Sequence, residues 1–170
     1  GPSLDEVYDM AIAGQVHPEL EGWLDENAGP LELVRQATAR ERFYLPLVSR
    51  SKLPVLLEMF VPSWHCCRQA AEALTVQAIL KMSRNDPRGA WDNILAAHRL
   101  ARLLDQAPTV IEQIVAVQIE GTAAKAGIAL ATRGHMPPAE MRELLSKLDA
   151  LRPVGHMVDA IDTVERFDGL

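Results

Sequence analysis

Apolar residues recur every three or four positions along most of this chain, and prolines and glycines separate the periodic stretches. Spacing of this kind places apolar side chains on one face of an α-helix. No stretch alternates apolar and polar residues as a half-buried strand does, and aromatic residues make up only 5% of the chain. The sequence therefore predicts an all-α fold with about seven or eight helices. We expect an antiparallel array of αα-hairpins, for which a superhelical, repeat-like arrangement is one possibility.

Residues 86–134 predict the clearest of these hairpins. Asp86 and Pro87 can begin one helix, which ends before Pro108, and a second helix follows over residues 109–132. The first helix is apolar on one side, whereas the second is apolar nearly all round. A helix that is apolar on every side is typically packed on every side. We therefore expect residues 109–132 to form the central helix of the fold.

The second helix also carries small side chains at helical spacing, which would let a neighbouring helix approach closely. They are Ala116, Ala123, Ala124, Gly127 and Ala131. Gln113 and Glu120 lie on or beside this stripe, so we expect both to point into the packing. A buried carboxylate must be paired or protonated. Glu120 is therefore either an acid–base or metal-binding residue or, the interpretation we favour, the ion-pair partner of Arg99 or Arg102 on the preceding helix.

Trp91, His98 and Arg102 follow one edge of the first hairpin helix. Such an edge is either the rim of a ligand pocket or, more commonly, the line where a core face meets solvent. No further His or Cys stands at ligand spacing, and no phosphate loop or nucleophile elbow is present, so we predict no catalytic residue, cofactor or metal. His156, Asp159 and Asp162 could hold a cation, but an exposed helix face gives the same spacing. The candidate polar cluster comprises Trp91, His98, Arg99, Arg102, Gln113 and Glu120.

Two local predictions before the hairpin depend on single residues. Pro62 should end a short helix over residues 55–60, because proline interrupts a helix interior. Ser63 would then cap a new helix that runs to about Met82, with Glu72 on the face opposite its apolar arc. An extended connector is expected at residues 44–48.

The adjacent cysteines Cys66 and Cys67 would lie in the first turn and a half of that helix. Neighbouring residues rarely form a disulfide, because the bond spans Cα atoms about 4.4–6.8 Å apart. A helix N-terminus would stabilise a Cys66 thiolate, but no positioned base accompanies it, so a catalytic role is not favoured. Cys67 points into the apolar arc, and we expect it to be inert.

The chain is long enough for a single domain with one core. Residues 1–3 resemble the remnant of a cleaved expression tag, and we expect the natural chain to continue beyond both ends. The predicted parts of the domain, which covers residues 4–170, are irregular N-terminal helices and a connector at 4–62, core helices at 63–134 and C-terminal helices at 137–168.

Composition and charge narrow the classes of partner. The formal net charge is −6, and the basic residues between Arg35 and Lys52 are interspersed with glutamates, which argues against a nucleic-acid partner. Residues 110–131 are largely apolar, but Glu112, Gln113, Gln118, Glu120 and Lys125 interrupt them, so we expect a buried helix instead of a membrane span. A protein partner or self-association is the expected interaction.

Several segments resemble an uncharacterised family of proteins from planctomycete-type bacteria. They are residues 27–34, 42–47, 90–103, 108–112, Glu120-Gly121 and 165–167. The resemblance covers most of the chain from Trp23 onward and implies a bacterial source and a helical architecture, but no catalytic residue. The junction from Asn85 to Trp91 also loosely resembles a tetratricopeptide hairpin, where proline and an aromatic residue mark the turn.

These observations lead us to expect a non-enzymatic helical scaffold or protein-interaction domain, because no residue pattern demands chemistry. The alternative is a small-molecule-binding or hydrolytic domain with an interhelical pocket around Glu120, His98 and Arg102. A self-assembling structural subunit is a third possibility. The expected location is the bacterial cytoplasm, or the periplasmic side of a membrane if the natural chain carries an N-terminal anchor.

Overall fold

The computed structural model describes residues 18–44, 56–107, 109–134, 136–155 and 161. These residues form α-helices and no strand, so the all-α prediction is confirmed for the described part of the chain. The helices are α2 (Pro18–Glu26), α3 (Ala28–Ala37), α4 (Leu56–Ser83), α5 (Pro87–Leu104), α6 (Val110–Arg133) and α7 (Pro138–Asp149).

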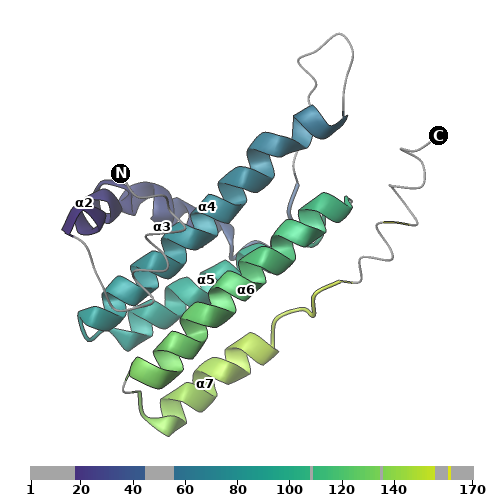
Figure 1. Cartoon of the computed structure of the whole chain (residues 1–170). Helices are drawn as coiled ribbons and strands as arrows, with labels where there is room; N and C mark the ends of the chain where they lie inside the picture. Colours follow the sequence, from purple (N-terminus) through teal and green to yellow (C-terminus); the bar gives the residue numbers. More distant parts are fainter. Residues whose placement is uncertain (1–17, 45–55, 108, 135, 156–160, 162–170) are drawn as a thin grey trace.

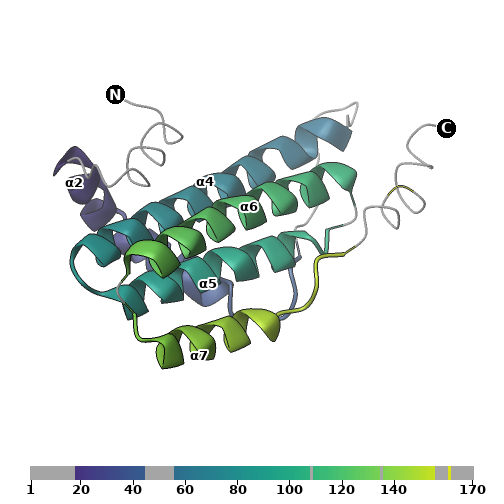
Figure 2. The ribbon, with the colours of Figure 1, turned by 60° about the horizontal axis from the view of Figure 1, so that its bottom comes forward.

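Helices α4, α5 and α6 pack as an antiparallel bundle, which Figures 1 and 2 show from two directions. The short helices α2 and α3 lie against α4, and α7 packs along α5. The six helices found here are fewer than the seven or eight expected. Residues 4–17 of the expected N-terminal helices, and residues 156–160 and 162–168 of the C-terminal helices expected over 137–168, lie outside the described residues.

Part of the difference in helix number comes from α4, where the structure has one helix of 28 residues in place of two. The predictions that Pro62 ends a helix and that Ser63 caps the next one are therefore wrong. Proline removes one backbone donor and crowds one turn, a cost of about 3 kcal/mol that tertiary packing can outweigh. The expected connector at residues 44–48 lies almost entirely outside the described residues.

The hairpin of α5 and α6 begins where the sequence predicts it. The Asp86 side chain accepts a hydrogen bond from the Gly89 backbone N–H (2.9 Å), and Pro87 occupies the first helical position. Thr109 and Glu112 form a reciprocal capping box at the start of α6. Both caps satisfy backbone donors that the first helical turn leaves without partners.

Three apolar clusters fill the described fold. The first lies between α4, α5 and α6 and consists largely of alanine, which brings the helix axes close together. The second surrounds Trp91 where α7 joins the bundle through Leu144, and the third joins α2 and α3 to the opposite face of α4. That third cluster explains why Glu72 is 6% exposed, in contact with Arg68 at 3.5 Å, instead of facing solvent as predicted.

The most enclosed helix is α5, not α6 as the sequence suggested. Twelve of the 18 residues of α5 are buried, against nine of the 24 in α6. Helix α5 lies between α4 and α6 and also touches α7, whereas one face of α6 has no described neighbour. Residues 109–132 are therefore a member of the bundle with an open side, and the prediction of a central helix there is wrong.

The arrangement does not support a tetratricopeptide-like array. The three bundle helices are 28, 18 and 24 residues long, whereas such arrays repeat a hairpin of about 34 residues with helices of nearly equal length. Helices α4, α5 and α6 pack around a shared apolar cluster and do not form a superhelix of stacked hairpins.

Candidate functional site

The predicted polar cluster forms in part, between α5 and α6. Arg102 of α5 donates two hydrogen bonds to the Glu120 carboxylate of α6, at 2.6 and 3.1 Å. His98, one turn earlier on α5, places Nδ1 3.0 Å from Glu120 Oε1, in an oblique contact that is an ion pair when the ring is protonated. The prediction that Glu120 is paired with an arginine of the preceding helix is confirmed, with Arg102 as the partner.

Arg102 also connects the hairpin to the segment after α7. Its Nε donates to the backbone carbonyl of Arg152 at 2.6 Å, so one guanidinium joins three separate parts of the chain. A second tie lies beside it: Asp105, whose side chain is 1% exposed, accepts a hydrogen bond from the Gly155 backbone N–H at 2.7 Å. Sequence reasoning missed Asp105, because its partner lies 50 residues away in a segment without a periodic pattern.

The protonation state of Glu120 follows from these contacts. Burial opposes its ionisation, but the contacts with His98 and Arg102 together outweigh burial and lower the pKa of the carboxyl below its ordinary value. Glu120 is therefore a carboxylate at neutral pH, with both oxygens engaged. The ionised carboxylate joins α5 to α6 through its contacts with His98 and Arg102.

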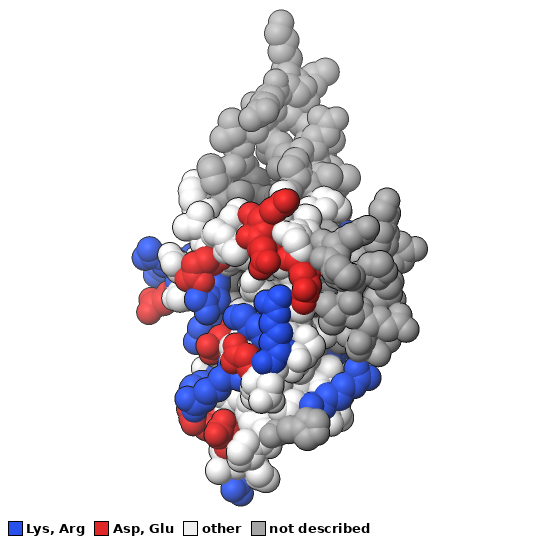
Figure 3. Space-filling model, turned by 90° about the vertical axis from the view of Figure 1, so that its left-hand side faces the viewer, with Lys and Arg blue, Asp and Glu red and all other residues white. Residues whose placement is uncertain are grey.

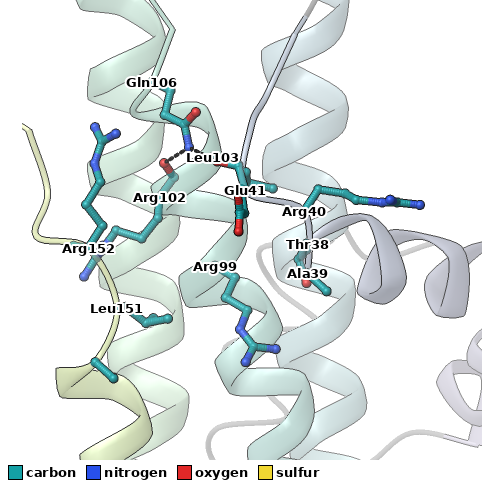
Figure 4. A pocket seen from close by; sticks show the side chains of 11 residues that line it. Thr38, Ala39, Arg40, Glu41, Arg99, Arg102, Leu103, Gln106, Leu151 and Arg152 are labelled. Atoms are coloured by element: carbon teal, nitrogen blue, oxygen red, sulfur yellow. Dashed lines mark hydrogen bonds between the residues drawn. The ribbon is translucent and has the colours of Figure 1, made fainter.

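The other three residues of the predicted cluster lie elsewhere. Trp91 is 3% exposed inside the second apolar cluster, so it belongs to the core and not to a pocket rim. Gln113 is buried near the start of α6, and its Oε1 has no hydrogen-bond partner. Arg99 makes no contact with Glu120 and lines a cavity of about 390 Å³ together with Glu41 and Arg102 (Figure 4).

The start of α4 decides whether Cys66 lies at a helix N-terminus, as the sequence predicted. Cys66 is the eleventh residue of this helix, so the proposed stabilisation of a thiolate at the helix N-terminus is wrong. Burial raises the pKa of Cys67 to about 11, as expected for an unreactive thiol in the apolar arc. Among the described residues no group of three His, Cys, Asp or Glu side chains could hold a metal, and His156, Asp159 and Asp162 lie outside them.

A feature that the sequence reasoning missed is the outer face of α6. Ile114, Val117 and Ile128 expose 42%, 47% and 65% of their surface. With Gly121, Ala124 and Ala131, which are also exposed, they form one continuous stripe. The positions 114, 117, 121, 124, 128 and 131 alternate steps of three and four residues, which is the spacing of a coiled-coil seam. We call these six residues the α6 outer stripe.

Helix α6 is also long and apolar enough to cross a membrane, judged by length and composition alone. In its most apolar window 39% of the residues are buried within the bundle, and Glu120 is ion-paired to α5. The helix therefore combines a packed side with an unpacked apolar side.

Charged residues of both signs occur together on one side of the molecule. On the side shown in Figure 3, acidic and basic side chains alternate in small groups and neither sign forms a continuous patch. Several of them form exposed ion pairs, such as Arg88 with Glu143 and Arg84 with Glu21.

Comparisons with known proteins add no homologue: no family model, no curated protein and no solved structure matches this chain. The resemblance to an uncharacterised planctomycete-type family therefore gains no support from them. What is shown is an all-helical protein with six helices in its described part.

Proposed function

We propose that this chain is a non-enzymatic helical interaction domain that self-associates through the α6 outer stripe. The observation that carries the proposal is the exposure of Ile114, Val117 and Ile128 on one line of a helix. Removing apolar surface from water gains about 25 cal/mol per Å², so a contiguous stripe of this kind favours a partner. The bundle would hold the stripe rigid, because α6 is fixed to α5 by the Arg102–Glu120 tie.

The positions along the stripe suit a second copy of the same helix. In an antiparallel pair about a two-fold axis, Ile114 meets Ala131, Val117 meets Ile128, and Gly121 meets Ala124, because each pair of numbers has the same sum. At the two ends a bulky side chain lies opposite a small one, and at the centre both are small. An isologous interface requires this self-complementarity.

The glycine at the centre makes this register testable. A Cβ built at Gly121 meets no atom within 4 Å, so the monomer has room for a larger side chain there. In the dimer, Gly121 and Ala124 would let the two helix backbones approach closely. Gly121→Leu should therefore keep the monomer folded, since leucine favours helix, while it blocks the proposed interface.

Light scattering after size exclusion, over a range of protein concentrations, tests the proposal. We expect a monomer–dimer equilibrium for the unmodified chain and a monomer for Gly121→Leu. A monomer at every concentration for the unmodified chain would overturn the proposal. So would binding to neutral lipid vesicles that removes the dimer, because the stripe would then be a membrane surface.

The alternative of a small-molecule-binding or hydrolytic pocket has one observation in its favour. Glu120, His98 and Arg102 converge, and Arg102 borders a cavity. We favour the interaction domain because the carboxylate and the guanidinium engage each other. A bacterial source and membership of the planctomycete-type family are likewise proposals, and neither supplies an activity.

A further inference from the structure

A second cavity of about 390 Å³ lies between α3, α4 and α5, away from the α6 outer stripe. Its walls are mostly apolar and come from all three helices and from the segment that follows α3. The apolar side chains that line it include Val34, Ala37, Phe43, Ala70, Leu100 and Leu103. Cavities of 300–1,000 Å³ with apolar walls and few polar groups are typical of small-molecule sites.

The charged side chains that line this cavity are all basic. Arg40 and Arg42 line it, and no Asp or Glu does. Both arginines are exposed, and in the described part of the chain neither guanidinium has an ion pair or hydrogen bond, although most of the described arginines do have one. Arg40 also lines the neighbouring cavity around Arg99 (Figure 4). Two unpaired arginines therefore line an otherwise apolar cavity that has no acidic side chain in its wall.

The neighbouring cavity differs in the features that matter for a ligand. It has the same volume, but Glu41 lines it, and Arg102 and Arg152 are engaged with Glu120 and Asp105. Two of its four arginines, Arg102 and Arg152, are thus paired with carboxylates, whereas Arg40 lines both cavities.

We infer that the cavity between α3, α4 and α5 binds a medium-length, straight-chain carboxylate, with the chain among the apolar walls and the head group at Arg40 and Arg42. A guanidinium pairs with a carboxylate through two parallel hydrogen bonds, which makes arginine the suitable side chain at this position. The small volume and the apolar walls accommodate an alkyl chain. Cys67, the thiol in the wall, stays uncharged at neutral pH because burial raises its pKa to about 11.

Isothermal titration calorimetry with octanoate, hexanoate and 1-octanol tests the binding of the alkyl chain separately from the binding of the carboxylate. Octanoate should bind saturably with one molecule per chain. Each buried methylene contributes about fourfold in affinity, so hexanoate should bind roughly fifteenfold more weakly. The absence of saturable octanoate binding below its micellar concentration would overturn the inference, as would equal binding of the two acids.

Three variants test the role of the named residues. The double variant Arg40→Gln, Arg42→Gln should lower octanoate affinity about tenfold and leave 1-octanol binding unchanged. Ala37→Trp, at an exposed rim position, should weaken both ligands by filling the cavity. Arg142→Gln on α7 is the control, because Arg142 is exposed and lines neither cavity. If the double variant binds octanoate as tightly as the Arg142→Gln control does, the arginines do not hold the carboxylate and the inference fails.

Discussion

Helices α5 and α6 are neighbours in one hairpin, yet their sequences and their surroundings contrast. Helix α5 has the one-sided apolar pattern expected of a surface helix, and twelve of its 18 residues are buried. Helix α6 is apolar nearly all round, and it exposes Ile114, Val117 and Ile128. Polar residues of α5, such as Asn93 and His98, are buried because they find partners or contacts inside the bundle. The apolar content of a helix therefore does not determine how far the helix is buried. Burial depends on which other elements pack against it.

The largest change in the free energy of unfolding should come from truncating a buried isoleucine of α5, compared with an exposed isoleucine of α6. Ile94 of α5 is fully buried in the second apolar cluster, whereas Ile128 of α6 is 65% exposed. Ile94→Ala should lower the free energy of unfolding by about 2–5 kcal/mol, through lost burial and a cavity. Ile128→Ala should change it by less than about 0.5 kcal/mol when the chain is monomeric. Urea unfolding at low protein concentration measures both, and similar losses would remove the contrast.

A smaller loss should follow when the tie between the helices is cut. Arg102→Ala removes the donor of two hydrogen bonds to Glu120 and one to the Arg152 carbonyl. Hydrogen bonds to charged groups contribute about 1.5–3 kcal/mol, so a loss of about 2 kcal/mol is expected for this partly exposed cluster. The same unfolding assay measures it, with Arg142→Ala, an exposed arginine of α7, as the control. Equal stability of the two variants would show that the tie is dispensable.

The pH dependence of stability should identify Glu120 as the anion of this tie. Its pKa in the folded chain lies below the ordinary value of 4.5. A depressed pKa contributes stability that is present above the unfolded value and is lost as the pH falls through the folded one. Glu120→Gln should therefore be less stable than the unmodified chain at pH 7, and the gap should close on acidification below about pH 4.5. A gap that stays constant down to pH 3 would contradict this assignment.

The smallest effect is a gain. Gly121→Ala adds a Cβ that meets no atom within 4 Å in the exposed middle of α6. Alanine is favoured over glycine in a helix interior by roughly 0.5–1 kcal/mol, so the monomer should become more stable by about that amount. Thermal unfolding at low concentration measures the change. A loss of stability would mean that the described monomer already has a neighbour at this position.

Local features could be predicted from the sequence. Asp86 and Pro87 mark the start of α5 by chemistry that acts within one turn, and the hairpin follows from it. The pairing of Glu120 with Arg102 could also be anticipated, because adjacent helices of a hairpin must lie side by side and a buried carboxylate needs a cation.

Features that depend on distant neighbours could not be predicted. Glu72 is buried because α2 and α3 pack on the second face of α4, which no pattern within α4 specifies. The error at Pro62 moved the expected helix start by seven residues, and the interpretation of Cys66 failed with it. No described element packs on the open side of α6, and the periodicity of a helix does not indicate which of its faces lacks a neighbour.

The most direct test of the central claim, that the outer stripe of α6 is an interface, compares two substitutions with matched exposure. Ile128 on α6 and Leu33 on α3 are 65% and 67% exposed. In sedimentation equilibrium, Ile128→Glu should be monomeric while Leu33→Glu should keep the monomer–dimer equilibrium of the unmodified chain. If both variants associate as the unmodified chain does, or if both lose association equally, the α6 outer stripe is not the interface.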